Sequence, residues 1–441
     1  MNKTIFMISG FTDVEKAGNQ TFKNTIKYLS EYGYRLKVFT FIPNNYGNLQ
    51  DPSKIFDSNV EFHRLPKIIQ GIINFGKLTK DSLGRWKLKK RDSNALESSQ
   101  AVDYYSEYNT LGRMIYIFYL FLFFLPIETL RTSYFYSKSK ADLFYGVNCQ
   151  GAIVASLMGR IFRKPVIIRY HGTGVVKADL KSLRRKILVF DEIAGMKVRS
   201  DAIIMANDGT NGDEILELLN VDRQKVHFWM NGLDIDNLIL TKDFDPEAFK
   251  KEKNIKDKKL IIMISRLVAW KRVDRGIQGM NLLVNEYKRD DFILLIIGDG
   301  PEREKLEELA KSLGLSENVR FAGGIPHKEV AKYLAISDLF LSFYDISNLG
   351  NPVLEALYFG VPVITISDRS TRDLLIDGYN STLIELENMP DNIPAAITKI
   401  IDNRDLRKSM SENTRKTFEQ RVLSWQKRID LEDQLIKRLI R

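Results

Sequence analysis

Short runs of apolar residues alternate with longer amphipathic segments along most of this chain. In the first part, "KTIFMIS" and "RLKVFTFI" flank the helical pattern "NQTFKNTIKYLSEYG", and "ADLFYG", "KPVIIRYHG", "SDAIIMAN" and "KVHFWMNG" follow. The second part repeats this rhythm with "KLIIMISR", "FILLIIGDG", "VRFAGG", "DLFLSFY" and "PVITIS". Short, fully apolar strands between helices are typical of parallel sheets that are covered on both faces. The pattern therefore predicts an α/β protein with two doubly wound domains.

The boundary between the two predicted domains lies near the polar stretch 238–257. We therefore expect an N-terminal domain over residues 1–237 and a C-terminal domain over residues 238–420. The last segment, 421–441, has apolar positions at helical spacing and lies outside the second series. We expect it to form a helix that packs back on the N-terminal domain. The length of 441 residues agrees with two domains, since a single core rarely serves more than ~300 residues.

Two segments interrupt the rhythm of the N-terminal domain. Residues 66–113 are basic and polar, and we expect a long insertion there. Residues 114–125 read "MIYIFYLFLFFL", an apolar run of twelve residues that is shorter than the ~20 needed for a membrane-spanning helix. Two alternatives follow for this run: a buried helix of the first domain, or a segment that dips into one leaflet of a membrane.

Charge is unevenly distributed along the chain. Residues 1–240 contain 33 Lys and Arg against 24 Asp and Glu, a net charge of +9, whereas residues 241–441 contain 33 against 32. A basic excess indicates an anionic partner, such as nucleic acid, acidic lipid headgroups or a phosphorylated substrate. The sequence has no transcription-factor motif, zinc-ligand spacing or RNA-binding aromatic pair, which argues against nucleic acid. The start "MNKTIFMISGF" lacks a signal-peptide pattern, and the single Cys149 excludes an internal disulfide, so we expect a cytoplasmic protein.

Polar residues follow several of the predicted strands, where open parallel sheets bind ligands. Arg266 and Lys271 follow "KLIIMI", and at one loop-to-helix junction both can reach a single anion such as a diphosphate. Taken alone, the two cations have a solvated basic loop as the alternative interpretation. The letters "DID" at 234–236 match a metal-binding Asp-x-Asp pair, but they follow Asn231-Gly232 and are better explained as a turn with a helix cap. We therefore expect no metal site.

Several longer motifs occur in a fixed order along the chain. "SRLVAWKRVD", "IIGDGPEREKLEELAKSLGLSENVRFAGGI" and "NPVLEALYFGVPVITISD" follow one another in the second half, and "GFTDVEKAGNQTF", "YHG" and "VHFWMNGLD" lie in the first. Together they resemble the GT-B glycosyltransferases of family 4, which transfer a sugar from a nucleotide donor with retention of configuration. The resemblance covers nearly the whole chain and is weakest across residues 45–140. It implies two Rossmann-like domains that face a central cleft.

The resemblance also assigns roles to individual residues. It implies that Arg266 and Lys271 hold the donor diphosphate, that Glu355 bonds the ribose hydroxyls, and that His171 lies near the transferred sugar and its phosphate. The other donor-binding residues that it implies are Gly18, Asn19, Ser265, Gly298, Phe321, Ser347, Asn348, Leu349, Gly350 and Asn351. A helix-surface acid remains the alternative for Glu355, and a structural histidine the alternative for His171.

One position departs from the family pattern. Eight residues before Glu355 the family commonly has a second glutamate near the sugar hydroxyls, and this chain has Ser347. A hydroxyl accepts a hydrogen bond but carries no negative charge. Asp345 is a possible substitute, although it equally suits a turn cap, and backbone groups of 348–351 offer further contacts to a sugar.

The resemblance implies a retaining, metal-independent transferase that needs no cofactor and uses a UDP- or GDP-sugar as its substrate. The basic N-terminal domain and the run 114–125 favour a lipid-linked or polysaccharide acceptor at the cytoplasmic face of an anionic membrane. The expected contact includes Trp86 and four neighbouring cations, Lys87, Lys89, Lys90 and Arg91. Two rival functions stay open: a non-catalytic sugar-nucleotide-binding partner subunit, which Ser347 motivates, and a GT-B epimerase acting on a nucleotide sugar.

Overall fold

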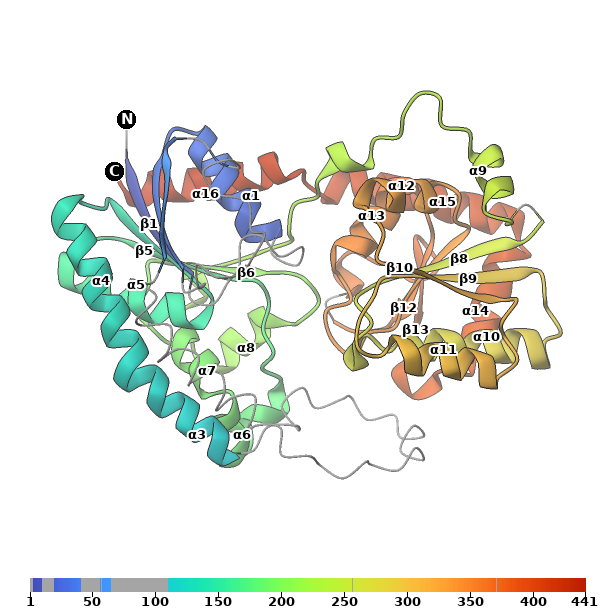
Figure 1. Ribbon diagram of the computed structural model, residues 1–441, viewed down its shortest axis with the longest axis horizontal. Coiled ribbons are helices and arrows are strands. Elements are labelled where there is room, and N and C mark those ends of the chain that lie inside the picture. Colours follow the sequence, from blue (N-terminus) through green and yellow to red (C-terminus); the bar gives the residue numbers. More distant parts are fainter. Residues whose placement is uncertain are drawn as a thin grey trace.

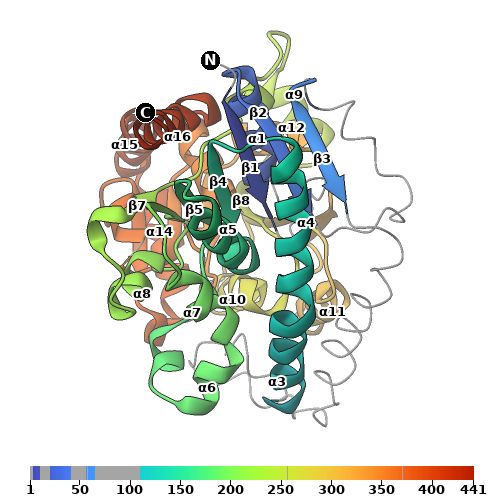
Figure 2. The same ribbon diagram turned by 90° about the vertical axis from the view of Figure 1, so that its left-hand side faces the viewer.

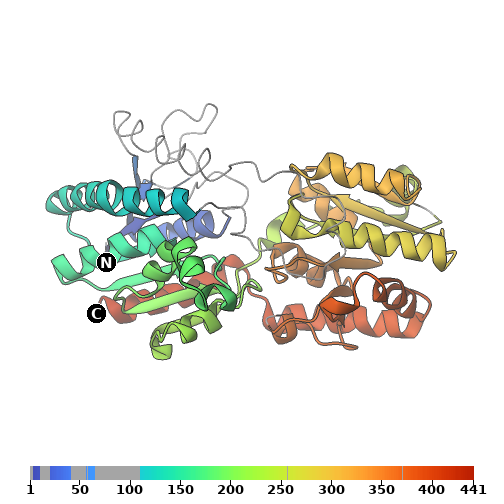
Figure 3. The same ribbon diagram turned by 90° about the horizontal axis from the view of Figure 1, so that it is seen from below.

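The structure, a computed structural model, describes residues 3–9, 20–40, 56, 58–64, 110–255, 257–369 and 371–441. Its two β-sheets lie in successive parts of the chain and belong to two bodies placed side by side (Figures 1 and 3). The predicted donor residues Gly18 and Asn19 lie outside the described residues, as do Trp86 and the four cations of 87–91 and most of the expected insertion 66–113.

The first sheet has seven strands in the order β3-β2-β1-β4-β5-β6-β7, and every neighbouring pair is parallel. Its strands are β1 (Thr4–Ile8), β2 (Arg35–Thr40), β3 (Val60–Arg64), β4 (Leu143–Val147), β5 (Val166–Tyr170), β6 (Ala202–Ala206) and β7 (Val226–Trp229). Its helices are α1 (Gln20–Glu31), α3 (Thr110–Tyr119), α4 (Leu125–Lys138), α5 (Asn148–Phe162), α6 (Leu183–Leu188), α7 (Phe190–Met196) and α8 (Gly212–Leu218).

The second sheet has six strands in the order β10-β9-β8-β11-β12-β13, again with parallel neighbours throughout. Its strands are β8 (Lys259–Ile264), β9 (Phe292–Ile297), β10 (Val319–Gly323), β11 (Leu339–Ser342), β12 (Val363–Ile366) and β13 (Ser381–Ile384). The helices that follow β7 are α9 (Pro246–Glu252), α10 (Val273–Asn281), α11 (Arg303–Ser312), α12 (His327–Ala335), α13 (Asn351–Phe359), α14 (Asn392–Ile401), α15 (Arg404–Arg421) and α16 (Trp425–Leu439).

Both sheets are buried on both faces, which explains why their strands are apolar without alternation. In β1, Ile5 and Met7 belong to one hydrophobic cluster, whereas Phe6 and Ile8 point to the opposite face and join another. In β8, Ile261 and Ile262 divide in the same way between the two clusters of the second sheet. Successive side chains of a strand point to opposite faces, so a strand with helices on both sides needs apolar residues at every position. The prediction of two parallel, doubly covered sheets is confirmed.

The C-terminal helix α16 returns to the first sheet, as expected from its apolar spacing. It extends from the second body across the first in Figure 1. Trp425, Ile429 and Ile436 join the cluster that contains Phe22 of α1, and Tyr34 Oη donates a hydrogen bond of 2.8 Å to Asp433. This packing ties the chain end to the N-terminal sheet.

A group of fully buried charges lies beneath α16. Glu432 of this helix accepts hydrogen bonds from Arg169 of β5, from Arg428 at 3.1 Å and from the hydroxyl of Tyr145 of β4 at 2.7 Å. Glu432 has an exposed fraction of 0%, and the two arginines have 1% each. The buried carboxylate compensates the charges of the two guanidinium groups. Removing any one of the three groups would leave buried charge without full compensation.

The apolar run 114–125 belongs to a helix longer than the run itself. The helix is continuous from Thr110 to Lys138 over 29 residues, through a π-helical turn at Leu120–Phe124 (Figure 2). By length and composition it could cross a membrane, so the expectation that the segment is too short to span is corrected. The apolar run ends before Glu128, but the helix continues to Lys138, and its buried residues there include Glu128, Thr132 and Tyr136.

The two faces of this helix have different environments. Tyr116, Leu120 and Phe124 are buried in a core cluster of the first sheet, as a core helix would be. The other face is exposed to solvent, with Phe118 64% exposed and Leu111 62% exposed. One side of the helix is therefore core, and the other is an exposed apolar surface; its contact with a membrane stays a prediction.

Candidate functional site

Loops at the carboxyl ends of strands from both sheets meet at the junction of the two bodies. The loop after β11 contacts the loop after β6: Ser347 N donates to Gly209 O at 3.2 Å, and Leu349 N donates to Asp208 O at 3.2 Å. A Cβ at Gly209 would lie 2.5 Å from Asn348 N, so the close approach needs glycine there. The residues that follow β5, β6, β8 and β11 are therefore brought to one place.

Lys271 lies in the loop after β8, enclosed by aromatic rings. Its Nζ is 3.6 Å from the ring centroid of Tyr344 and 4.2 Å from that of Trp270. The pKa of Lys271 is lowered to about 7, mainly by burial and in part by the charge of Arg266. The charge of Asp208 opposes this shift. Arg266 itself is exposed to solvent. An anion placed between these two cations would relieve their repulsion and restore the charge of Lys271.

The loops after β8 and β9 are in backbone contact. Gly298 has φ +138°, and a Cβ there would lie 1.8 Å from the carbonyl oxygen of Ser265. Ser265 N donates to Ile297 O at 3.0 Å. A side chain at position 298 would therefore push Ser265 and the cation loop out of place. The predicted residues Ser265 and Gly298 thus shape this loop through their backbone.

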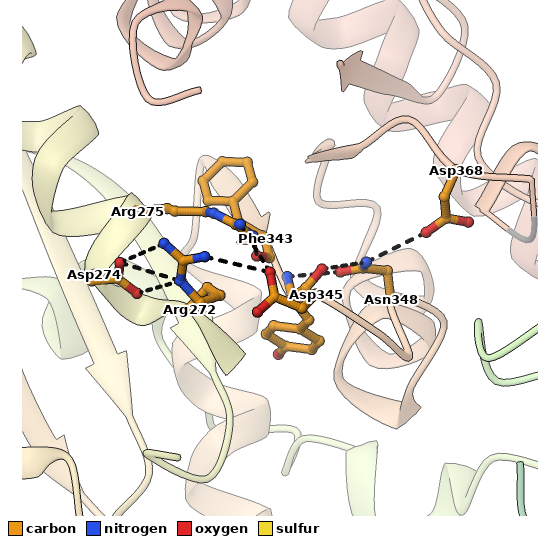
Figure 4. A network of polar contacts seen from close by, with 8 residues as sticks. Arg272, Asp274, Arg275, Phe343, Asp345, Asn348 and Asp368 are labelled. Atoms are coloured by element: carbon orange, nitrogen blue, oxygen red, sulfur yellow. Dashed lines mark hydrogen bonds and ion pairs between the residues drawn. The ribbon is translucent and has the colours of Figure 1, made fainter. Parts of the chain in front are cut away.

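Asp345 is held by arginines of the second body. Arg275 Nη2 is 2.8 Å from its carboxylate and Arg272 Nη1 is 3.5 Å away, while the side chain is 1% exposed (Figure 4). Arg272 in turn pairs with Asp274 at 3.0 Å. These ion pairs engage the carboxylate on the C-terminal side of the junction. Asp345 is a structural residue here, and the suggestion that it takes the place of the missing glutamate is not supported.

The side chain of Asn348 fixes the loop after β11. Its Oδ1 accepts from Tyr344 N at 3.0 Å and from Ser342 Oγ at 3.2 Å, and its Nδ2 donates to Tyr344 O at 2.9 Å. Figure 4 shows the further contact of Nδ2 with Asp368, at 3.4 Å. Asn348 therefore orders the loop from within and offers its backbone, rather than its side chain, to a ligand.

The residues on either side of Asn348, in the loop after β11, make different contacts. Ser347 has φ +65°, a left-handed conformation that is uncommon outside glycine, and its hydroxyl donates to Asp208 Oδ2 at 3.3 Å. Leu349 is buried in the core, and Gly350 precedes the first turn of α13. Asn351 Nδ2 donates to Gln20 Oε1 of α1 at 3.0 Å, a second contact between the two bodies.

Glu355 is a buried residue of α13 that pairs with a histidine. Its Oε1 lies 2.8 Å from His327 Nε2, and within the part of the chain that the structure describes its buried Oε2 has no hydrogen-bond partner. The bond to Glu355 raises the pKa of His327 above its usual value. One carboxylate oxygen is thus fixed and the other remains able to accept, which argues against the alternative of an exposed helix-surface acid.

His171 follows β5 and is half-buried. Burial and the charge of Arg169 lower its pKa to about 3, so its imidazole is neutral at physiological pH. Its backbone N donates to Asn148 Oδ1 at 3.4 Å, whereas its buried Nε2 has no hydrogen-bond partner among the described residues. Buried ring nitrogens normally have partners, so the unpartnered Nε2 fits a group that contacts a ligand.

Phe321 lies on β10, farther along the second sheet than these loops. It is half-buried and packs against one of that sheet's core clusters. The strand has a register irregularity between Phe321 and Gly323, and Gly298 N donates to Gly323 O at 2.9 Å. The strand that carries Phe321 therefore meets the Gly298 loop at Gly323.

Within the part of the chain that the structure describes, no group of three or more His, Cys, Asp or Glu side chains is arranged to hold a metal ion. The letters "DID" at 234–236 form a turn in which Asp234 accepts from Asn237 Nδ2 at 2.6 Å.

Two residues of the site escaped the sequence analysis. Asp208 is within "MANDGT", which has the composition of an ordinary turn, and its partner Ser347 is 139 positions away. His327 opens α12 and reaches Glu355 from 28 positions away. The one usable signal was rarity: the chain has four histidines, and two of them lie here.

Residues 244–417 match the family described as "Glycosyl transferases group 1". An uncharacterized glycosyltransferase of Methanocaldococcus jannaschii is 26% identical over 304 residues, which cover 67% of this chain and 74% of that protein. The GDP-mannose-dependent alpha-(1-6)-phosphatidylinositol monomannoside mannosyltransferase of Mycolicibacterium smegmatis is 31% identical over 162 residues, 35% of this chain and 41% of that protein.

Solved structures share the arrangement of both bodies. Sucrose-phosphate synthase from Thermosynechococcus elongatus has a TM-score of 0.70 and 16% identity, and covers 99% of each chain. HepE of Anabaena, solved with UDP, has a TM-score of 0.66 and 15% identity over 98% of this chain and 99% of that chain. Likeness at this identity shows the fold, and it confirms the expected GT-B architecture.

Proposed function

We propose that this chain, whose residues 244–417 match the group 1 glycosyltransferases, transfers a sugar from a nucleotide-diphosphate sugar with retention of the anomeric configuration. The observation that carries the proposal is the position of Lys271, a desolvated cation beside Arg266 at the junction of the two bodies. The HepE relative was solved with UDP, which supports the same class of donor.

The side chains divide the work of binding the donor. Lys271 and Arg266 hold the diphosphate and meet the negative charge that grows on it as the glycosyl bond breaks. The free Oε2 of Glu355 accepts from the ribose, while His327 holds Oε1 in place. Neutral His171 offers Nε2 to the sugar or its phosphate without adding charge.

The transfer step needs no separate base. The bond between the anomeric carbon and the β-phosphate oxygen breaks, and the acceptor oxygen bonds to the same carbon from the same face. The acceptor's proton passes to the departing phosphate oxygen, so the atoms and charges balance. The enzyme supplies orientation and stabilises the leaving group.

A panel of UDP- and GDP-sugars tests this function on the purified chain, with EDTA present. We expect one donor to raise the melting temperature and to be slowly hydrolysed. The hydrolysis rate should be the same with and without EDTA, because protein cations meet the diphosphate charge. Activity that is lost in EDTA and restored by magnesium or manganese would contradict the metal-independent part. Binding without hydrolysis or transfer would favour the rival, a non-catalytic partner subunit, and interconversion of the free nucleotide sugar would favour the epimerase.

We further propose that the acceptor is lipid-linked and that the protein meets it at the cytoplasmic face of a membrane. The mannosyltransferase of Mycolicibacterium smegmatis is named for a phosphatidylinositol acceptor, and another relative is named for lipopolysaccharide core biosynthesis. The exposed apolar face of helix 110–138 suits such a surface. Phe121 lies 5.9 Å from the ring of Phe190 of α7, and α6 adds Leu183, which is 77% exposed.

Cations accompany this apolar face. Arg184 Nε donates to Thr110 Oγ1 at 3.3 Å, which places α6 beside the start of the long helix. Lys181 and Lys186, on either side of Leu183, are exposed as Arg184 is. Each Lys or Arg near an anionic lipid surface contributes about 1 kcal/mol within roughly one Debye length.

We expect the protein to sediment with phosphatidylglycerol vesicles at low salt and to be largely released at high salt. Replacing both Phe118 and Leu183 by serine is expected to weaken this binding at least about tenfold, because each large apolar side chain gains ~1.5–3 kcal/mol on full burial. The variant Ile376→Ser, which changes an exposed apolar residue of the C-terminal body, is the matched control and should bind as the wild type does. If the wild type ignored anionic vesicles at low salt, a soluble acceptor would become the better proposal.

A further inference from the structure

Asp208 is a carboxylate of the N-terminal body that reaches the C-terminal one. It follows β6, and its Oδ2 accepts from Ser347 Oγ at 3.3 Å across the junction. Its other oxygen, Oδ1, accepts from Thr210 Oγ1 at 2.7 Å and from Thr210 N at 3.2 Å. Neither the family match, which begins at residue 244, nor the donor-site assignments above include this residue.

Two further observations place this carboxylate at the donor site. A Cβ at Gly172 would lie 2.5 Å from Asp208 Oδ2, so the carboxylate lies directly against the turn that carries His171. Its charge also acts on Lys271, where it opposes the lowering of the lysine's pKa. Asp208 is therefore enclosed by His171-Gly172, Ser347 and Lys271.

A negative charge is an unexpected feature at this point. Desolvation raises the pKa of Asp208, and the hydrogen bonds from Thr210 and Ser347 only partly offset it. The same charge repels the diphosphate that the neighbouring cations attract. An asparagine would keep the turn at Thr210 through its own Oδ1, since that contact needs only an acceptor. The charge is therefore not needed for the turn, and it opposes binding of the leaving group.

We propose that Asp208 is a catalytic residue that contacts the transferred sugar, accepting a hydrogen bond from a hydroxyl and stabilising the positive charge that develops at the anomeric carbon. This assignment rests on the proposed transferase function. Among the described residues Asp208 forms no salt bridge, and it lies between His171 and the lysine to which we assign the diphosphate, where the sugar of a nucleotide-diphosphate sugar would lie. The substrate class is a sugar with at least one free ring hydroxyl.

The variant Asp208→Asn separates the two effects of the charge. The affinity for the free nucleoside diphosphate is measured by calorimetry at about pH 5.5, below the Lys271 pKa of about 7, so that the lysine is protonated with or without its acidic neighbour. Under these conditions, removing the negative charge should leave this affinity at least as high as in the wild type. The rate of nucleotide-sugar hydrolysis should fall at least about 100-fold, the usual cost of one electrostatic contact to a transition state. Asp208→Ser, which also lacks charge and keeps an acceptor, is the second variant if the amide disturbs folding.

Asp213 provides the matched control. It lies shortly after Asp208 and also crosses the junction, pairing with Arg369 at 3.0 Å, but it has no contact with the donor loops among the described residues. Asp213→Asn should hydrolyse the donor at nearly the wild-type rate. Equal losses in the two variants would instead assign Asp208 to domain contact and overturn the proposal.

The remaining outcomes are distinct. If Asp208→Asn lost nucleoside-diphosphate affinity together with turnover, its role would be structural and the proposal wrong. If the variant turned over like the wild type, the assignment of Asp208 would fail while the transferase function stood. A wild-type protein that neither bound nor hydrolysed any donor would overturn the transferase function first, and this assignment with it.

Discussion

Sugar transfer is expected to fall at least about a hundredfold when Lys271 is replaced by alanine, with the melting temperature unchanged or raised. Its ammonium group lies over the rings of Tyr344 and Trp270, where we propose that the diphosphate leaves. A charge-assisted contact to a leaving group in an enclosed site contributes ~3 kcal/mol or more to lowering the barrier. Burial lowers the pKa of Lys271 to about 7, so the charged lysine is disfavoured in the protein without donor. Removing the side chain is therefore not expected to lower the free energy of unfolding.

Lys253 supplies the matched control for this prediction. Its Nζ lies 5.3 Å from the ring centroid of Phe249 on α9, a cation near an aromatic ring but remote from the donor loops. Lys253→Ala should transfer sugar at the wild-type rate. Near-normal transfer by Lys271→Ala, at an unchanged melting temperature, would remove Lys271 from the donor site.

The same lysine makes donor binding depend on pH. We expect the diphosphate to bind the protonated lysine, so binding should raise the pKa of Lys271 from about 7. At a pH where Lys271 is deprotonated in the free protein, binding should take up a proton. Affinity for the nucleoside diphosphate should therefore be highest below pH ~7 and decline above it, by up to tenfold per pH unit. Calorimetry in buffers of different ionisation enthalpy measures the proton uptake, which Lys271→Ala should abolish.

The overall arrangement of the sheets could be predicted from the sequence because burial on both faces demands apolar residues at every strand position. This requirement is local, so "KLIIMI" and "FILLII" reveal it without any knowledge of their partners. The same locality placed Arg266 and Lys271 at the end of β8, since the residue after a strand is set by that strand alone.

Contacts between distant segments were beyond such reasoning. Asp345 could be suggested for a sugar contact because it lies near Ser347, but its ion pairs with Arg272 and Arg275 come from another strand-to-helix connection. Asp208 reaches the site through a loop that reads as a plain turn, and His327 reaches Glu355 only because α12 and α13 pack together. The length of helix 110–138 was underestimated because apolar composition ends before helical backbone does.

The largest loss of stability is expected from Glu432→Ala. The variant leaves the guanidinium groups of Arg169 and Arg428, each 1% exposed, without the carboxylate between them. Breaking a buried ion pair by removing one partner costs ~3–5 kcal/mol, because the remaining charges stay buried and uncompensated. We expect urea unfolding of the N-terminal body, with the attached helix α16, to begin at a clearly lower concentration, followed by the fluorescence of Trp425 and Trp229.

Asp430 on the same helix separates this effect from mere loss of an acid. It accepts a hydrogen bond from Tyr32 in a half-buried position, and Asp430→Ala should cost about 1 kcal/mol or less. Glu432→Gln keeps the shape and the acceptor oxygen but removes the charge, so it should fall between Glu432→Ala and the wild type. If Glu432→Ala unfolded within 1 kcal/mol of Asp430→Ala, roughly the value of an ordinary hydrogen bond, the buried charges would not be what holds α16 on the first sheet. The apolar contacts of Trp425, Ile429 and Ile436 would then carry the attachment, since these side chains lie in the same cluster as Phe22.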